Sequence, residues 1–178
     1  MSDVEPYVRP PSAESTGEAP GRGRLEGRQV LVVGGGQRVV DAATDPMGNG
    51  RAMCLLFARE GAHVAVADRN GASAEETVGL ITAEHGSAFA IEADITHEGD
   101  VARMVAEARD ALGGLDGLVL NVGIGAGRLG LAGVAVDDWD TTLATNLRGP
   151  MLCCREALPV LGIQSIQRSS EARLSMAT

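Results

Sequence analysis

Short apolar runs alternate with amphipathic segments along most of this 178-residue chain. Each run is rich in valine, leucine, isoleucine or alanine, which is typical of a strand buried on both faces of a sheet. The predicted strands are "QVLVV" at 29–33, "HVAVAD" at 63–68, "AFAIEAD" at 88–94 and "LDGLVLN" at 115–121. The segments between them have helical periodicity, so the order of elements predicts an α/β fold with a parallel sheet covered by helices on both faces.

Local signals mark the ends of the predicted helices. The helix after the first strand is expected to end at Gly61, because glycine is the usual C-terminal cap. In the next helix, Ser73 followed three residues later by Glu76 is typical of a capping box. The last helix is expected to begin near Val136 and to run, with a bend at Pro150, to about residue 161.

The chain is long enough for one domain of ordinary size. Residues 1–26 are rich in proline, glycine, serine and glutamate, and are predicted to form a flexible tail. Residues 27–161 are predicted to form the domain, and residues 162–178 an irregular C-terminal tail.

The composition disfavours several classes of function, namely binding of nucleic acid, membrane surfaces and metal ions. The net charge is −9 and all 15 basic residues are arginine, so nucleic acid and anionic membrane surfaces are not expected as partners. Aromatic residues make up only 2% of the chain, which disfavours a base-stacking surface. The cysteines lie in apolar segments without metal-ligand spacing, so we expect core thiols and no metal site. Without a signal-peptide pattern or a membrane-length apolar run, a cytoplasmic location is expected.

A glycine-rich turn follows the first predicted strand, and a carboxylate ends the second. Such a turn lets the backbone approach a pyrophosphate at a helix N-terminus, and the acid can accept hydrogen bonds from ribose hydroxyls. Eleven residues separate the two groups of glycines, far more than the usual fingerprint has, so an ordinary surface loop is the alternative. The residues expected to hold a dinucleotide are Gly34, Gly35, Gly36, Gly48, Asn49, Gly50 and Asp68.

Several stretches in order resemble the short-chain dehydrogenase/reductase family over about residues 27–161. "GGG...GNGRA" is similar to a lengthened form of that family's TGxxxGIG loop, and "LDGLVLNVGIG" to its LDxLVNNAG strand end. "EADIT" is similar to the family's xxDVT, and "WDTTLATNLRGPMLCCREALPVL" to its asparagine-bearing helix. The resemblance implies a Rossmann-type doubly wound parallel sheet in three layers, incomplete at its C-terminal side.

The same resemblance implies further site residues. Asp94 and Ile95 are expected near the adenine, although Asp94 could instead cap the end of the third strand. Asn146 matches the asparagine that braces the family's catalytic lysine through water. The remaining residues expected at the cofactor are Arg69, Asn121, Val122 and Gly123.

The resemblance implies hydride transfer between a nicotinamide cofactor and a small-molecule carbonyl or alcohol. Asp68 would repel a 2′-phosphate, so NAD(H) is expected rather than NADP(H), although Arg38 and Arg69 could offset that repulsion. The family also forms oligomers through the helix that matches residues 136–161, and an uncovered fourth strand would favour self-association.

The family's catalytic tyrosine and lysine have no counterpart in the sequence. Tyr7, in the predicted tail, is its single tyrosine, and there is no lysine. We therefore expect a C-terminally truncated member with impaired or absent turnover, in which "SIQRSS" at 165–170 is a weak match to the family's fifth strand. A noncatalytic NAD-binding module and an S-adenosylmethionine-dependent methyltransferase are the alternatives. Trp139 and Asn146 in the last helix favour the dehydrogenase family over the methyltransferase.

Overall fold

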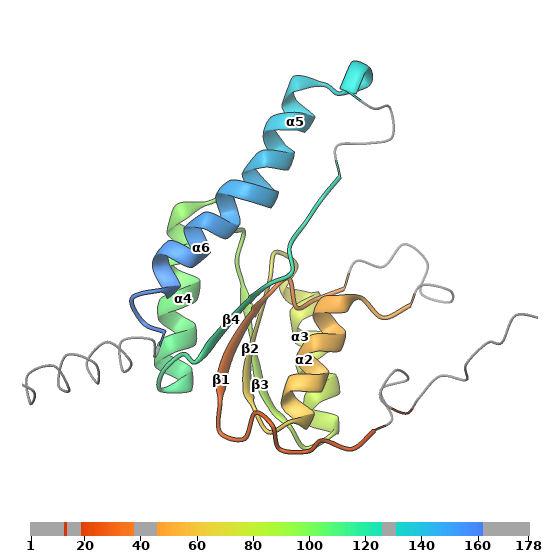
Figure 1. The fold of residues 1–178 in the computed structure, drawn as a ribbon, viewed down its shortest axis with the longest axis vertical. Coiled ribbons are helices and arrows are strands. Elements are labelled where there is room, and N and C mark those ends of the chain that lie inside the picture. The colour runs from red at the N-terminus through yellow and green to blue at the C-terminus, as the bar shows by residue number, and fades with distance from the viewer. Residues whose placement is uncertain (1–12, 14–18, 38–45, 126–130, 162–178) are drawn as a thin grey trace, which may run out of the picture.

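A computed structural model of the chain describes residue 13 and residues 19–37, 46–125 and 131–161. Strands and helices alternate along it (Figure 1). The strands are β1 (Gln29–Val33), β2 (His63–Asp68), β3 (Ser87–Glu92) and β4 (Gly117–Leu120). The helices are α2 (Asn49–Arg59), α3 (Gly71–Ala83), α4 (Glu98–Leu112), the 3-10 helix η1 (Leu131–Gly133), α5 (Val136–Leu143), the π-helical turn η2 (Ala144–Arg148) and α6 (Gly149–Ala157).

The four strands form one parallel sheet in the order β3-β2-β1-β4. In the register of the sheet, Leu31 of β1 lies between Ala65 of β2 and Leu118 of β4. Helices α2 and α3 cover one face, and α4 and α6 cover the other (Figure 1). The expected α/β class, the doubly wound parallel sheet and its three layers are confirmed.

The core consists of two layers that share the strands. Leu31 and Val33 pack on the α4 and α6 side, whereas Val30 and Val32 pack on the α2 and α3 side. This alternation follows from the period of two residues in a strand. Because both faces are covered, β1 needs apolar residues at every position, which explains the uninterrupted "VLVV".

Two of the three cysteines lie in this core. Cys54 packs in the layer between α2 and the sheet, and burial raises the pKa of its thiol to about 12. Cys153 is buried against the other face, and burial likewise raises its pKa to about 11. Cys154 is exposed, so the expectation of three core thiols is wrong for this residue, which lies on the outer side of α6.

The N-terminal part of the described chain is held to the end of α2. The side chain of Glu60 is only 4% exposed, and its Oε1 accepts a hydrogen bond from Arg24 Nη2 at 2.7 Å. Its Oε2 accepts from the backbone N–H groups of Arg22 and Arg24, both at 3.0 Å. Arg22 and Arg24 belong to residues 1–26, which the sequence predicts to form a flexible tail, and these contacts join that segment to a carboxylate of the domain.

Replacing Glu60 with Gln is expected to destabilise the fold in a pH-dependent way. The hydrogen bond from Arg24 and the surrounding N–H groups lower the pKa of Glu60 from 4.5 to about 2. Because the folded-state pKa is the lower one, the stabilisation is present above the unfolded-state pKa and is lost as pH falls toward 2. Thermal melts should therefore separate wild-type and Glu60→Gln chains most at neutral pH, and the gap should shrink between pH 5 and pH 2.

Glu75 offers a matched control, because it is exposed on α3. The Glu75→Gln change removes the same charge, and its melting temperature should track the wild type across this range. A gap between wild type and Glu60→Gln that stays constant down to pH 2 would contradict the role assigned to Glu60.

Helix α3 begins earlier than the capping box predicts. Asn70 is the N-cap, and its Oδ1 accepts a hydrogen bond from Ser73 N at 3.2 Å. Asn70 stands three residues before Ser73 and is as good a cap as serine, so the helix gains a further turn from it. The hydroxyl of Ser73 is thereby left to contact the glycine-rich turn.

A π-helical turn over residues 144–148, which includes Asn146, interrupts the last helix just before Pro150. Proline has no N–H, so Pro150 cannot donate to the carbonyl of Asn146 four residues earlier. The chain passes through the π-helical turn η2, in which the Gly149 N–H reaches the carbonyl of Ala144, five residues back. Such π-turns within α-helices occur frequently at functional sites.

Candidate functional site

The first glycine of the turn is in close contact with the start of α2. Gly34 has a positive φ of 82°, which favours glycine. A Cβ on Gly50 would overlap the Gly34 carbonyl oxygen and would lie 2.8 Å from Asn121 Nδ2. The Asn121 amide in turn donates to the Gly34 carbonyl at 3.3 Å. The N-terminus of α2 therefore lies against the ends of β1 and β4 despite the long connection.

Asp68 faces the same turn. Its Oδ2 accepts a hydrogen bond from Gly36 N at 3.0 Å, and its Oδ1 accepts from Asn70 N at 2.9 Å. A Cβ on Gly36 would lie 2.8 Å from Oδ2 of Asp68, so this close approach needs a glycine. The carboxylate and the glycine-rich turn are thus brought together at the carboxyl edge of the sheet, as their positions after parallel strands predict.

Thr77 of α3 and Arg51 of α2, which had no predicted role, support the glycine-rich turn. Thr77 is fully buried, and its hydroxyl donates to the Gly35 carbonyl at 3.0 Å. Arg51 of α2 donates from Nε to the same hydroxyl at 3.0 Å and pairs with Glu76 at 2.9 Å. The spacing of Ser73 and Thr77 on one face of a helix was the only available signal, and by itself it indicates no contact with the turn.

Asp94 lies at the end of β3 and is engaged locally. Its Oδ1 accepts hydrogen bonds from the N–H of Thr96 at 2.9 Å and from the Thr96 hydroxyl at 2.7 Å. Partial burial opposes ionisation, but the Thr96 hydrogen bonds and the charges of His97 and Arg69 together lower the pKa of Asp94. Asp94 therefore holds the turn that follows β3, and its expected position near the adenine stays a prediction. Ile95 is buried, and its side chain packs against Gly149 of α6.

Asn146 fixes the segment that follows β4. Its Oδ1 accepts a hydrogen bond from Ile124 N at 2.9 Å, and its Nδ2 donates to the Ile124 carbonyl at 2.7 Å. Because both ends of its side-chain amide are used, Asn146 ties the π-helical turn to the backbone just after Val122 and Gly123. Asn146 is thus connected to the glycine-rich turn only indirectly, through the strand end that carries Asn121.

The structure therefore gathers most of the expected site residues at the carboxyl edge of the sheet. Gly50 contacts Gly34 and Asn121, and Gly36 contacts Asp68, whereas Asp94 follows the outer strand β3. Of the connection between the glycine groups, only Gln37, Pro46 and Met47 are described, and Arg38 lies outside the described residues.

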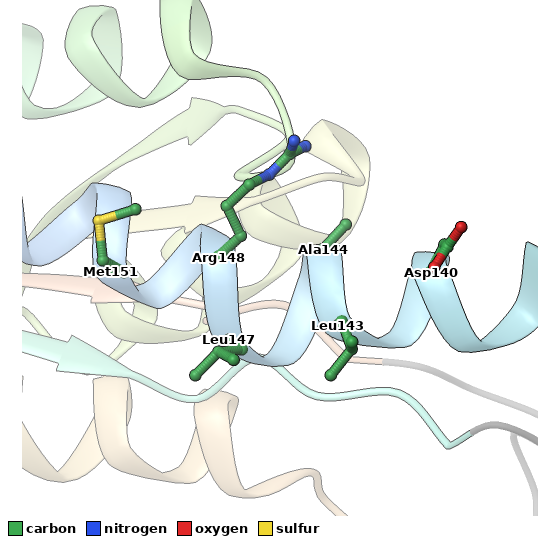
Figure 2. A pocket seen from close by; sticks show the side chains of 6 residues that line it. All are labelled: Asp140, Leu143, Ala144, Leu147, Arg148 and Met151. Atoms are coloured by element: carbon green, nitrogen blue, oxygen red, sulfur yellow. The ribbon is translucent and has the colours of Figure 1, made fainter.

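A separate apolar hollow of about 420 Å³ lies on the last helix. Figure 2 shows Leu143 and Leu147 on one side of that helix and Arg148 reaching away from them. Arg148 donates to the Thr96 carbonyl at 2.8 Å, which links η2 to the segment between β3 and α4. None of the lining residues belongs to the glycine-rich turn, so this hollow is distinct from the candidate site. The lining residues are Asp140, Leu143, Ala144, Leu147, Arg148 and Met151.

Two other features are absent from the described ranges. No group of three or more histidine, cysteine, aspartate or glutamate side chains there is arranged to hold a metal ion. In the same part of the chain, every helix is too short or too polar to cross a bilayer.

Comparisons with known proteins indicate the family to which this chain belongs. Residues 38–169 match the family described as short chain dehydrogenase. A glucose 1-dehydrogenase from Gluconobacter oxydans is 37% identical over 144 residues, which are 79% of this chain and 49% of that protein. A protein from Xanthobacter autotrophicus named inactive 2-(S)-hydroxypropyl-CoM dehydrogenase 2 is 41% identical over 106 residues, or 60% of this chain and 44% of the relative.

Solved structures agree with the sequence comparisons. A structure from Burkholderia xenovorans described in the terms of this family is 37% identical, superposes with a TM-score of 0.72, and is matched over 79% of this chain and 53% of the other. The chain belongs to the short-chain dehydrogenase/reductase family, whose members bind NAD(H) or NADP(H). It spans about half the length of the curated relatives it matches.

Proposed function

We propose that this chain binds NAD(H) at the carboxyl edge of its sheet, as the cofactor-binding part of a short-chain dehydrogenase/reductase. The observation that carries the proposal is the contact between Gly34 and Gly50, which leaves no room for a Cβ and sets the N-terminus of α2 beside the first turn. A helix N-terminus presents free N–H groups and a positive dipole end, both suited to a pyrophosphate.

The residues present fit such a cofactor. The N–H groups at Asn49 and Gly50 would hold the pyrophosphate, and Asp68 would accept the hydroxyls of the adenosine ribose. Arg69, Asp94 and Ile95 would lie along the adenine side. The other residues assigned to this cofactor are Gly35, Gly36, Gly48, Asn121, Val122 and Gly123.

The preference for NAD(H) over NADP(H) rests on Asp68. Its carboxylate accepts hydrogen bonds from two backbone N–H groups, which hold it beside the glycine-rich turn. A 2′-phosphate placed against that charge would be repelled and desolvated without a compensating partner.

Turnover by this chain alone is a separate part of the proposal. The bound nicotinamide supplies hydride chemistry, while proton transfer in this family needs a tyrosine and a lysine. The sequence has no lysine, and its single tyrosine is Tyr7. General acid-base catalysis contributes about 10²- to 10⁴-fold, so we expect binding with little or no dehydrogenase turnover. The relative named as inactive supports this second candidate, a noncatalytic NAD-binding module. The substrate of any active assembly would be a small carbonyl compound or alcohol.

Calorimetric titration of the purified chain with NADH, NADPH and S-adenosylmethionine tests the proposed function. Saturable binding of NADH, with weaker binding of NADPH, is the expected result. Binding of S-adenosylmethionine alone, or of none of the three, would contradict it.

Self-association through the last helix is proposed as well. Five large apolar side chains recur there every three or four residues, with exposed fractions from 40% to 73%. Such a contiguous apolar face is typical of an interaction surface. The face is formed by Val136, Trp139, Leu143, Leu147 and Met151.

Sedimentation of the purified chain should therefore give a mass of at least a dimer, and Leu147→Glu should shift it toward the monomer. Leu80→Glu is the control, because Leu80 is similarly exposed but lies on α3. A wild-type chain that sediments as a monomer would contradict the proposal.

A further inference from the structure

Gln37 bridges the two ends of the lengthened connection. It stands at the near end, directly after the three glycines, and Pro46 and Gly48 stand at the far end. Its side-chain Oε1 accepts a hydrogen bond from Gly48 N at 3.2 Å, and its Nε2 donates to the Pro46 carbonyl at 3.4 Å. One side-chain amide therefore spans the gap that the eight residues 38–45 connect along the chain.

The backbone of Gln37 is itself anchored. Its N–H donates to Ser73 Oγ at 2.7 Å, and the Ser73 hydroxyl contacts the Gln37 carbonyl at 3.1 Å. Ser73 is buried at the start of α3, whose N-cap Asn70 also hydrogen-bonds to Asp68. Gln37 thus connects Ser73, which lies close to Asp68, to Gly48, the residue directly before α2.

We propose that Gln37 is a positioning residue for the dinucleotide site, an inference that rests on the proposed function. A long connection leaves the N-terminus of α2 more freedom than a short loop does, because closing a longer loop costs more entropy. The hydrogen bonds of the Gln37 side chain supply the restraint on the N-terminus of α2 that a short loop would otherwise give. This restraint keeps the N–H groups of α2 opposite the Gly34 to Gly36 turn before the cofactor arrives.

The hydrogen bonds of Gln37 distinguish a positioning residue from a side chain that blocks the pyrophosphate site. Its Oε1 takes the N–H of Gly48, which precedes the helix. The N–H of Asn49, the first residue of α2, forms no hydrogen bond to another described residue. Gln37 therefore positions the helix end without occupying the N–H groups assigned to the pyrophosphate.

The Gln37→Ala chain should bind NADH about three- to tenfold more weakly, because two neutral hydrogen bonds of ordinary net strength are lost. Gln29→Ala removes the same amide group at the opposite end of β1 and should leave the dissociation constant unchanged. Calorimetric titration measures all three chains. Tighter NADH binding by Gln37→Ala would show that Gln37 blocks the site in the wild type. Unchanged binding would show that Gln37 has no role in the site. Either result overturns the proposal.

A chain with a shortened connection between Gln37 and Pro46 separates the positioning role from a purely structural one. When two glycines replace residues 38–45, the short loop itself restrains α2, and Gln37→Ala should then weaken NADH binding less than about twofold. A Gln37→Ala effect that persists undiminished in the shortened chain would overturn the positioning role.

Amide hydrogen exchange at Gly48 separates this proposal from the proposed function. In the cofactor-free chain, exchange at Gly48 should be slow in the wild type and faster in Gln37→Ala. If NADH does not bind to the wild type, the proposed function fails, while Gly48 exchange still reports whether Gln37 forms its bridge. Equal exchange rates in the two chains would show that it does not, and would overturn the inference even where NADH binds.

Discussion

The Gly50→Ala chain is expected to bind NADH about 10- to 100-fold more weakly, because hydrogen bonds from the start of α2 to a charged pyrophosphate contribute about 1.5–3 kcal/mol. Its new Cβ would overlap the backbone carbonyl of Gly34 and would lie 2.8 Å from Asn121 Nδ2. Backbone atoms cannot rotate away as a side-chain end can, so the N-terminus of α2 must move from the turn. The same overpacking should destabilise the fold by about 1–3 kcal/mol.

Calorimetry measures the first effect and a thermal melt the second. Gly79→Ala is the matched control, since Gly79 lies within α3 and a Cβ there would meet nothing within 4 Å. Alanine favours a helix over glycine by about 0.5–1 kcal/mol, so this control should bind NADH normally and melt slightly higher. A Gly50→Ala chain that binds NADH like the wild type would show that α2 does not meet the cofactor.

The Asp68→Asn chain is expected to bind NADH about 10- to 100-fold more weakly, because hydrogen bonds to a charged group contribute about 1.5–3 kcal/mol. NADPH binding should not weaken in parallel, since the repulsion of its 2′-phosphate is removed together with the charge. The ratio of the two dissociation constants should therefore shift toward NADPH. Competition titrations with both cofactors provide that ratio.

Asparagine is nearly isosteric with aspartate, but its Nδ2 donates and cannot accept, so Asp68→Asn keeps only one of the two hydrogen bonds from Gly36 and Asn70. Asp138→Asn on α5 is the control for the change in net charge, because Asp138 is exposed and remote from the site in the chain order. Equal losses for NADH and NADPH in Asp68→Asn would contradict the assignment of cofactor preference to this carboxylate.

The sequence was sufficient to predict those features that depend on local patterns. Apolar runs such as "VLVV" specify strands covered on both faces, and short alternating elements specify a parallel sheet. Because parallel strands end at one edge, the glycines after β1 and Asp68 after β2 were expected to meet, and they do. Gly61, with its φ of 92°, ends α2 as predicted.

Features that depend on contacts between distant residues could not be predicted in the same way. The polar segment around Arg24 has no apolar pattern, and its ordering depends on Glu60, 36 residues away. Gln37 is one polar residue among many in a long connection until the fold brings Ser73 beside it. Asn70 and Ser73 are both good N-caps, so local propensity alone does not choose between them.

The π-helical turn in the last helix has a local cause in the sequence, but the cause and its effect lie at different residues. Pro150 lacks an N–H, and the consequence appears four residues earlier, where Asn146 stands in the π-helical turn. A proline in a helix suggests a bend at the proline itself. Here the missing donor shifts the hydrogen bonding of the preceding turn, and Asn146 uses its side chain to hold Ile124.

Mapping backbone amide chemical shifts by NMR while NADH is added tests the central claim most directly, namely that the start of α2 and Asp68 form one dinucleotide site. The expected result is a set of saturable shifts concentrated at Gly35, Asn49, Gly50, Asp68 and Asn121. Saturable shifts confined to α5 and α6, or no shifts at all, would contradict the claim.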